Sequence, residues 1–576
     1  MKKAQAAIAM LLLGSAVPTQ AEPVALVGGT IVDGTGSKPI EGGVVLLDGD
    51  RITAVGSKDA VRIPSNARRI DVRGKWITPG LVDAHVHFSQ SGSIYTRPDA
   101  IDLTKVIPYK QDVEQSKARL DETFRRYLAS GVTTVVDAGG PLWIYEVRNR
   151  ASSGVTAPRV AVAGALIATE PAPETTKLDW GEPIIVSAAS PREAAELARA
   201  QLQRKPDLIK IWGIGSGPEG SARVRDITRA VVAVARPAGV RVAVHATRLE
   251  TAEAALDGGA DVLVHSVEDA PLTPAFIAKL KANNAVYVST LMVHEGYRDA
   301  FLGQVQLTAI ERGNSDPNIL ASLYEMPHGV IERATARYPA DPVPQVSANA
   351  LALLRAGGRL AAGTDAGNIG TLHGPALHRE LQMLSQAGLT PSQVLTAATR
   401  DAAFAYSARP DIGVLAPNYR ADLLILDADP LKSVSNLSRI SQVWSRGVAY
   451  RPSQLLPSSP ELVVERQLQA YNSRDLDNFL ATYAENVQVY DLPVTTKPSI
   501  EGKAAMRKIY GDIFQKFPAI HCRGAQRMVE GRFVIDQEVC SLDPAKPPFH
   551  ASATYEVVDG VIRRVWFADA QVKLQE

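Results

Sequence analysis

The chain has 576 residues, enough for roughly three to four domains of about 150 residues each. Apolar residues make up 45% and charged residues 21%, the balance of an ordinary globular protein. The formal net charge is +1, so there is no electrostatic case for nucleic acid or an acidic membrane surface as a partner.

The N-terminus has the pattern of a secretory signal peptide. Two lysines precede the apolar or small stretch 6–17, which is too short to span a bilayer. Small residues lie before a cleavage site at Ala21, so the mature chain is expected to begin near Glu22. No Cys lies there to carry a lipid, and we expect no membrane anchor. A signal peptide over 1–21 predicts a periplasmic or secreted protein; a buried N-terminal helix is the alternative.

Both flanks of the central region are rich in short strand patterns. The stretches 24–78 and 413–452 carry β-formers bounded by Gly, Asp or Pro, and neither alone is large enough for a comfortable sandwich. We therefore predict one composite β-sandwich from 22–78 and 406–452, with another domain inserted between its halves.

The insert, 79–405, alternates strand and helix patterns, which is typical of parallel βα units. Eight strand candidates fit a (β/α)8 TIM barrel of normal size. They are 81–88, 132–139, 158–164, 207–212, 240–246, 260–266, 285–290 and 359–366. The segment between the last two is long, about 68 residues, and such loops at a barrel mouth are usually functional, often as lids. The predicted class is therefore α/β.

Beyond the insert and its flanks, residues 453–460 are rich in Pro and Ser and read as a linker. The pattern over 461–576 predicts helices followed by four strands near the C-terminus, an α+β domain. Both cysteines of the chain, Cys522 and Cys540, fall on neighbouring predicted strands of this domain. Export would permit a disulfide, but the strand register needed to pair them is undetermined.

The strongest chemical signal is a set of metal-compatible side chains at predicted strand ends. His85 and His87 stand two apart on the first strand, so both imidazoles can face one side. Further candidates follow on later strands: Lys210, His245, His265 and Asp365. Because the carboxyl ends of barrel strands meet on one face, these groups are expected to converge there. A lone strand histidine is more often a core residue, but that account does not suit all four.

Here the sequence resembles the amidohydrolase superfamily, in its imidazolonepropionase-like and prolidase-like branch. The matching stretches are ITPGLVDAHVHF, GVTTVVDAGG, DLIKIW, VAVHATRLETAEAALDGGADVLVHSV, AAGTDAG, GLTPSQVLTAATRDAA and IGVLAPNYRADLLILDADPL. They are spread over nearly all of residues 24–452. The family's β-sandwich is likewise built from both ends of the chain.

The resemblance implies a role for each candidate ligand. His85 and His87 would bind the more buried of two divalent metals with Asp365, and His245 and His265 would bind the second. Lys210 would be carboxylated and bridge the two metals, which requires a neutral amine, as burial near cations favours. Zinc is the expected metal, with manganese or iron as alternatives. Asp365 would act as general base and then general acid.

The sequence also departs from the family. Many prolidase-like members carry Gly-Gly-His after the third strand, where this chain has ALIATEPAPETTKLDWGEP, and Val136 replaces the usual Arg of the second strand. Dipeptidase activity is therefore in doubt. His294 and His373 follow the seventh and eighth strands near the expected mouth and are candidates for substrate contact, although an exposed loop histidine usually makes none.

The region 461–576 resembles the nuclear-transport-factor-like (ketosteroid-isomerase-like, SnoaL-like) cone-shaped α+β domains. The resemblance lies in the pattern of two helices, a strand, a third helix and curved strands ending in GVIRRVWFAD. Tyr471, Asp491 and His521 could line its pocket, although core and surface roles are favoured, and we assign no catalysis there.

These observations predict a metal-dependent hydrolase of an amide, cyclic amide or dipeptide-like bond, acting on a small molecule and capable of forming a homo-oligomer. One alternative is phosphotriester or carbamate hydrolysis at the same site. Another is a small-molecule-binding or dimerisation protein that acts through its C-terminal domain, with the barrel as a relic. The intact set of six ligands argues against a relic, which would be expected to have lost at least one.

Overall fold

The computed structural model describes residues 22–178, 181–327, 329–331, 343–456, 459–493, 496–542 and 547–569. The expected signal peptide, 1–21, lies outside these residues. Within the described part of the chain, none of the helices combines the length and the apolar character needed to cross a bilayer.

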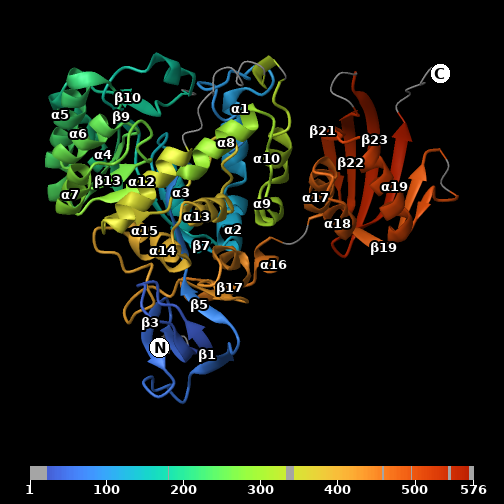
Figure 1. Cartoon of the computed structure of the whole chain (residues 1–576), viewed down its shortest axis with the longest axis horizontal. Helices are drawn as coiled ribbons and strands as arrows, with labels where there is room; N and C mark the ends of the chain where they lie inside the picture. The colour runs from blue at the N-terminus through green and yellow to red at the C-terminus, as the bar shows by residue number, and fades with distance from the viewer. Residues whose placement is uncertain are drawn as a thin grey trace, which may run out of the picture.

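Strands from both ends of the chain form a single sheet of eight strands, drawn at the bottom of Figure 1. The N-terminal strands are β1 (Val24–Ile31), β2 (Ile40–Asp48), β3 (Arg51–Ser57), β4 (Arg68–Asp71) and β5 (Trp76–Pro79). The C-terminal ones are β16 (Leu423–Leu426), β17 (Ile440–Ser445) and β18 (Val448–Tyr450). The two sets join where β5 pairs antiparallel with β16. The barrel is therefore inserted between the halves of this sheet.

All eight predicted barrel strands are present, and each is shorter than its sequence pattern. They are β6 (Leu81–Val86), β7 (Val132–Asp137), β8 (Arg159–Val162), β11 (Leu208–Trp212), β12 (Arg241–His245), β13 (Val262–Val264), β14 (Val286–Val288) and β15 (Arg359–Ala361). Adjacent strands pair in parallel. The amide of Asp207 bonds the carbonyl of Val162 at 3.0 Å, and that of Ala84 bonds Ala362 at 3.1 Å. These two bonds close the ring between β8 and β11 and between β15 and β6.

Two short strands, β9 (Leu166–Ala168) and β10 (Ile185–Ser187), were not expected from the sequence. β9 pairs in parallel with the end of β11, and β10 pairs with β9. They extend the sheet at the carboxyl end of the barrel, with the 3-10 turn η1 (Pro173–Leu178) between them.

Helices surround the barrel, as Figure 1 shows. They are α1 (Tyr109–Ala118), α2 (Leu120–Ala129), α3 (Ile144–Ser152), α4 (Pro191–Leu202), α5 (Gly217–Ala235), α6 (Leu249–Asp257), α7 (Pro274–Ala282), α8 (Leu291–Phe301), α9 (Ala309–Asn314), α10 (Pro317–Ser322), α12 (Val343–Arg355), α13 (Ala376–Gln386), α14 (Pro391–Ala397) and α15 (Arg400–Tyr406). The barrel interior is filled by small side chains, chiefly Val and Ala, and α15 closes its lower end with Ala402 and Ala403. Small residues suit this interior because an eight-stranded barrel is only wide enough for a packed core.

The predicted linker, 453–460, is partly helical. Helix α16 (Pro452–Leu455) occupies its first part and packs against α2, while α17 begins at Pro460. Two of the predicted linker residues, 457 and 458, lie outside the described residues. The Pro- and Ser-rich stretch therefore includes a short connection, and the N-terminal end of this connection is anchored to the barrel through α16.

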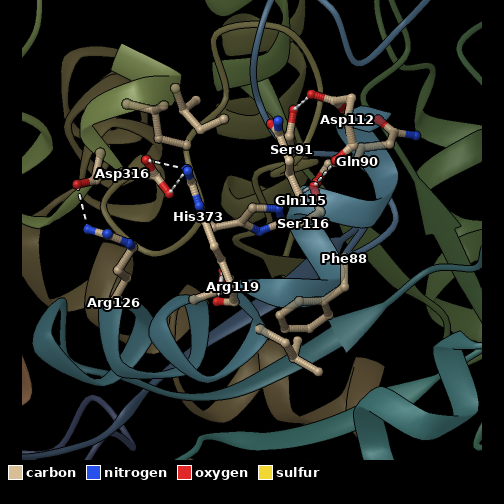
Figure 2. Close-up of a pocket in the computed structure, with 15 residues that line it drawn as sticks. Phe88, Gln90, Ser91, Asp112, Gln115, Ser116, Arg119, Arg126, Asp316 and His373 are labelled. Carbon is tan, nitrogen blue, oxygen red and sulfur yellow. Dashed lines mark hydrogen bonds and ion pairs between the residues drawn. The ribbon is translucent and has the colours of Figure 1, made fainter. Parts of the chain in front are cut away.

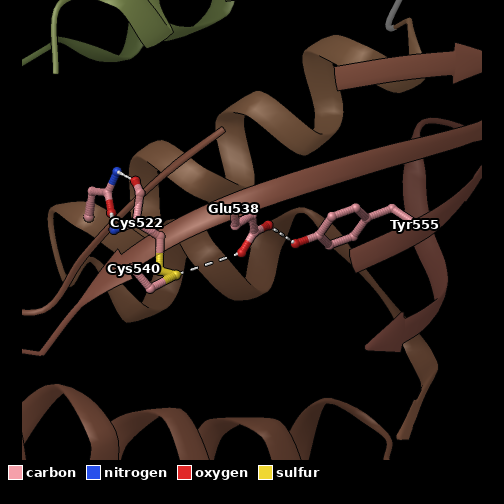
Figure 3. Close-up of a disulfide and its surroundings, with 5 residues drawn as sticks. Cys522, Glu538, Cys540 and Tyr555 are labelled. Atoms are coloured by element: carbon pink, nitrogen blue, oxygen red, sulfur yellow. Dashed lines mark hydrogen bonds between the residues drawn. A yellow bond between two sulfur atoms is a disulfide. The ribbon is translucent and has the colours of Figure 1, made fainter. Parts of the chain in front are cut away.

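The C-terminal domain packs helices on one face of a six-stranded sheet (Figure 1). Its elements are α17 (Pro460–Asn472), α18 (Leu476–Ala481), β19 (Tyr483–Asp491), β20 (Ile500–Glu501), α19 (Lys503–Lys516), β21 (His521–Glu530), β22 (Phe533–Ser541), β23 (Phe549–Val558) and β24 (Val561–Asp569). Cys522 lies opposite Cys540 in the β21–β22 register, and the two form a disulfide (Figure 3). This pairing answers the question that the strand patterns left open.

The three residues proposed for a pocket in this domain have different surroundings. Tyr471 packs in an aromatic cluster with Phe479 and Phe514, and Asp491 is exposed. The ring of His521 instead faces the barrel domain, 5.5 Å from that of Tyr324. The role favoured from the sequence, core and surface, agrees with this arrangement.

The C-terminal domain rests on the long segment between β14 and β15. Helix α17 contacts both α9 and α10, and the guanidinium of Arg466 donates to the carbonyl of Gly313 at 3.1 Å. The same segment contributes α8 to the mouth of the barrel. The described helices α8, α9 and α10 of this segment therefore contact the barrel on one side and the C-terminal domain on the other.

Candidate metal centre and substrate cavity

Three Lewis-basic atoms meet at the carboxyl end of the barrel. The Nε2 atoms of His85 and His87 lie 3.1 Å apart, and each lies close to Oδ1 of Asp365, at 3.3 Å and 3.2 Å. All three side chains are buried. Donor atoms of this kind at mutual contact distance fit a divalent metal ion, which prefers imidazole and carboxylate ligands.

A bulge in β6 brings the two histidines to this position. Val82 and Ala84 face the barrel interior, but β6 has one more residue than β7 between Asp83 and Val86. The extra residue shifts the alternation of side chains, so that His85 and His87 turn inward together. Their spacing of two then places both rings on one side, as the sequence predicts.

Neighbouring groups set the ring tautomers. Nδ1–H of His87 donates to the carbonyl of Gly139 at 2.7 Å, and Nδ1 of His265 lies 2.8 Å from the hydroxyl of Thr290. A carbonyl can only accept, so Nδ1 of His87 carries the proton and its lone pair is on Nε2, the atom that lies 3.2 Å from Asp365. The bond to Gly139 therefore prepares the His87 ring to act as a ligand.

The remaining predicted ligands lie beside this group. The His265 ring is 4.8 Å from that of His85 and 4.6 Å from that of His245, so the histidines form a continuous arc. Lys210 lies on β11 and is 1% exposed, and it lines the same cavity as His245, His265 and Asp365. All six residues that the sequence singles out are therefore brought to one end of the barrel.

Burial sets the protonation of the centre. It lowers the pKa of His85 and His245 well below the usual value, and the charge of Lys210 adds to this effect. Burial also lowers the pKa of Lys210 to about 8, against the opposing charge of Asp365. For Asp365 itself, burial favours the neutral acid, but the surrounding histidines, His85 first, hold its pKa well below the normal range. Neutral imidazoles and an ionised carboxylate are the forms that bind metal.

Asp365 does not lie at the end of the eighth strand, where the sequence pattern placed it. Strand β15 stops at Ala361, and Asp365 lies in the following turn with a φ of 62°. His265 also has a positive φ, 74°, one residue after β13. A left-handed conformation is uncommon for such residues and is found where the surroundings hold it for function.

A buried carboxylate supports the turn. The amide and hydroxyl of Thr364 donate to Asp83 at 3.0 Å and 2.7 Å, and Asp83 also accepts from the amide of His85. Gly363 lets the turn approach closely, because an added Cβ would lie 3.0 Å from the His85 nitrogen. Asp83 is thus a positioning residue for two predicted ligands.

Replacing Asp83 with Ala should weaken metal binding by about 10- to 100-fold, the usual effect of losing a group that orients a ligand. Metal titration of the metal-free protein would measure this change. Thr364→Ser keeps the hydroxyl and serves as the matched control, with affinity expected within a few-fold of the parent. A folded Asp83→Ala protein with unchanged affinity would contradict the assigned role.

A cavity of about 460 Å³ opens beside the six residues. Val293, His294, Tyr297 and Arg298 of α8 line it, at the spacing that places residues on one face of a helix. His294 therefore lies at the cavity as predicted, with its Nε2 3.6 Å from the carboxylate of Glu268.

His373 lies elsewhere, and the expectation that it contacts substrate requires correction. Its Nδ1 is 2.8 Å from the hydroxyl of Tyr127, and its Nε2 is 2.8 Å from the carbonyl of Gln90. Figure 2 shows the separate, smaller cavity that it lines, where the ring stacks on Phe88. Since both ring nitrogens are engaged within the protein, His373 supports the loop after β6.

The cavity also contains residues that the sequence analysis did not select, chiefly Arg97, Trp212, Glu268 and Tyr297. Trp212 ends the strand that carries Lys210, and Glu268 follows His265 by three residues. A position at the end of a barrel strand, or a few residues after it, is the signal that could have identified Trp212 and Glu268. Arg97 lies far along the loop after β6, and no local pattern marks it.

The region that contains this cavity matches a known protein family. The family model described as Amidohydrolase family matches residues 76–449, well over half of the chain. The chain belongs to the amidohydrolase family. A SnoaL-like domain model matches residues 464–565, in the C-terminal domain.

Individual relatives of this amidohydrolase are distant. A dihydroorotase of Anaeromyxobacter dehalogenans is 28% identical over 211 residues, which is 34% of this chain and 45% of that protein. An enamidase of Eubacterium barkeri is 23% identical over 71% of this chain and 87% of its own length. A solved Xaa-Pro dipeptidase with bound methionine has a TM-score of 0.56 at 22% identity, covering 74% of this chain and all of that one. The chain thus spans less than half of the dihydroorotase, and the solved structure supports the fold alone.

Proposed function

We propose that the protein is a metal-dependent hydrolase of an amide-like C–N bond, either linear or cyclic. The convergence of His85, His87 and Asp365 at the edge of a ligand-sized cavity carries this proposal. Membership of the amidohydrolase family supports the reaction class. The chain is also similar to a dihydroorotase and an enamidase, which are named for cyclic or amide-like substrates.

When bound, divalent metals supply an activated water and polarise the scissile carbonyl. Asp365 is ionised in the folded protein, so its carboxylate can accept the proton of the attacking water. It then returns this proton to the leaving nitrogen, which departs as a neutral amine. Thr364 and Asp83 hold the carboxylate in place for both transfers.

We further propose that the centre holds two metals, with zinc favoured, and that a carboxylated Lys210 bridges them. The buried amine with its pKa lowered to about 8 supports this role, because carboxylation requires the neutral form. His245 and His265 complete the second set of ligands. The His265 ring lies beside the rings of His85 and His245, so both groups of proposed ligands lie at one wall of the cavity.

Elemental analysis of the purified mature protein tests the proposal. We expect close to two metals per chain, loss of at least 100-fold in amide hydrolysis after treatment with a chelator, and recovery on adding zinc or manganese. Full activity in protein shown to be free of metal would contradict the proposal. One metal per chain, with full activity, would exclude the bridging role of Lys210.

We also propose that the protein is exported after cleavage near Ala21. The disulfide between Cys522 and Cys540 supports this, because such bonds persist in oxidising compartments. N-terminal sequencing of the protein from the periplasm or medium should give a chain that starts near Glu22. Recovery of the uncleaved chain from the cytoplasm alone would argue against export.

A further inference from the structure

The wall of the substrate cavity beside Lys210 is apolar. Leu166, Leu178, Ile184, Ile185 and Trp212 line it. Four of them come from β9, β10 and the segment between these strands, in the region where prolidase-like sequences carry the Gly-Gly-His stretch. A wall of this kind favours an apolar group of the substrate, because burying apolar surface against apolar side chains is favourable. Its aliphatic side chains offer no hydrogen bond to a polar group.

Both arginines at the cavity are already paired with carboxylates of the protein. Arg97 donates from Nε and one terminal nitrogen to the two oxygens of Asp99, at 2.8 Å and 2.6 Å. Its other terminal nitrogen donates to Asn368. The side chain of Asp99 is 8% exposed, so this pair is shielded from water and its charges are little screened.

The second arginine follows the same pattern. Arg298 bonds its own neighbour, Asp299, from two nitrogens at 3.1 Å and 3.0 Å. A substrate carboxylate that approached either guanidinium would also approach the carboxylate that neutralises it. Desolvating an anion without a compensating charge is costly, so neither pair makes a favourable site for one.

Apart from the proposed metal ligands and the two arginines, the cavity is lined by one acidic side chain among the described residues, that of Glu268. Glu268 lies across from His294, and burial, with a smaller contribution from Asp269, raises its pKa to about 7. This carboxyl would repel an anionic substrate when ionised. Among the described lining residues, the cavity therefore combines an apolar wall, two compensated cations and one acid.

We propose that the cavity selects electrically neutral substrates whose apolar group packs on Leu178, Ile184 and Trp212. It would discriminate against substrates whose leaving amine carries a carboxylate, dipeptides among them. This inference rests on the proposed hydrolase function and adds the substrate class.

Two anilides of the same shape test the proposal. 4-(Phenylacetamido)benzamide and 4-(phenylacetamido)benzoate differ only in a neutral carboxamide or a carboxylate on the leaving aniline. With the metal-loaded full chain, we expect kcat/KM for the benzamide to exceed that for the benzoate by at least ten-fold. Equal values, or a preference for the benzoate, would overturn the inference while leaving the hydrolase function intact.

Variants of the Arg97–Asp99 pair provide the internal control. Arg97→Met should change the benzamide-to-benzoate ratio less than three-fold, because the paired guanidinium does not serve a substrate anion. Asp99→Asn removes the negative charge that pairs with the Arg97 guanidinium, and it should lower the benzamide-to-benzoate ratio at least five-fold. A selective loss of benzoate hydrolysis in Arg97→Met would show instead that Arg97 binds carboxylates. A general loss of activity lowers kcat/KM for both anilides alike and leaves their ratio unchanged. A weakened variant therefore still reports the substrate preference.

Binding separates failure of the inference from failure of the proposed function. If the metal-loaded protein cleaves no C–N bond in either anilide, the proposed function fails for this class. The dissociation constants of both compounds, measured by calorimetry, then test the inference by themselves. We expect the benzamide to bind at least ten-fold more tightly, and tighter binding of the benzoate would overturn the inference.

Discussion

Asp365→Asn is expected to lower kcat by about 10²- to 10⁴-fold, the usual contribution of a general acid–base group. The amide keeps the shape of the side chain and one oxygen, but it cannot accept the proton of the attacking water. The loss should appear in kcat and in kcat/KM alike, because proton transfer occurs in the transition state and not in substrate binding.

Three measurements make this result specific. Metal content and melting temperature should be recorded with kcat, because Asp365 is also a predicted ligand and lies in a strained turn. Asp411→Asn makes the same chemical change in a half-exposed ion pair with Arg51 of the composite sheet, and it should leave kcat within a few-fold of the parent. An Asp365→Asn protein with full metal and full kcat would exclude the proton shuttle.

The barrel could be predicted from the sequence because its strands carry a strong local signal. Each is a short run rich in Val, Ile or Ala, buried on both faces and followed by a helix pattern. The ends of the strands could not be predicted, because they depend on contacts between distant segments. Asp365 illustrates this: bonds from Thr364 to Asp83 on another strand, and not the local sequence, hold its turn.

The convergence of the candidate ligands could be predicted for a related reason, since the carboxyl ends of barrel strands meet whatever the details of packing. The rest of the cavity depends on how a helix is rotated against the barrel. Tyr297 and Arg298 face the cavity because of the orientation of α8, which its sequence alone does not determine. His373 was misassigned for the converse reason: its partners, Tyr127 and the Gln90 carbonyl, come from segments far away in the chain.

Lys210→Ala is expected to remove one of the two proposed metals and to reduce activity by at least 100-fold. The physical reason lies in the chemistry of the buried amine. With a pKa of about 8, about a tenth of it is neutral at pH 7, and the neutral form can take up carbon dioxide to give an anionic oxygen ligand. Without that ligand, the second metal keeps only His245 and His265 from this part of the chain.

Rescue by small carboxylates distinguishes this account from a structural role for the lysine. Acetate or propionate can enter the space left in Lys210→Ala and supply the missing oxygens, so both metal content and activity should recover in part and with saturation. Lys210→Arg is the matched variant, because it keeps the charge and length but cannot be carboxylated, and it leaves no room for an added anion. It should be inactive and should not respond to either carboxylate. If Lys210→Arg were instead active, the positive charge would be what the site requires, and the bridging carboxylate would be excluded.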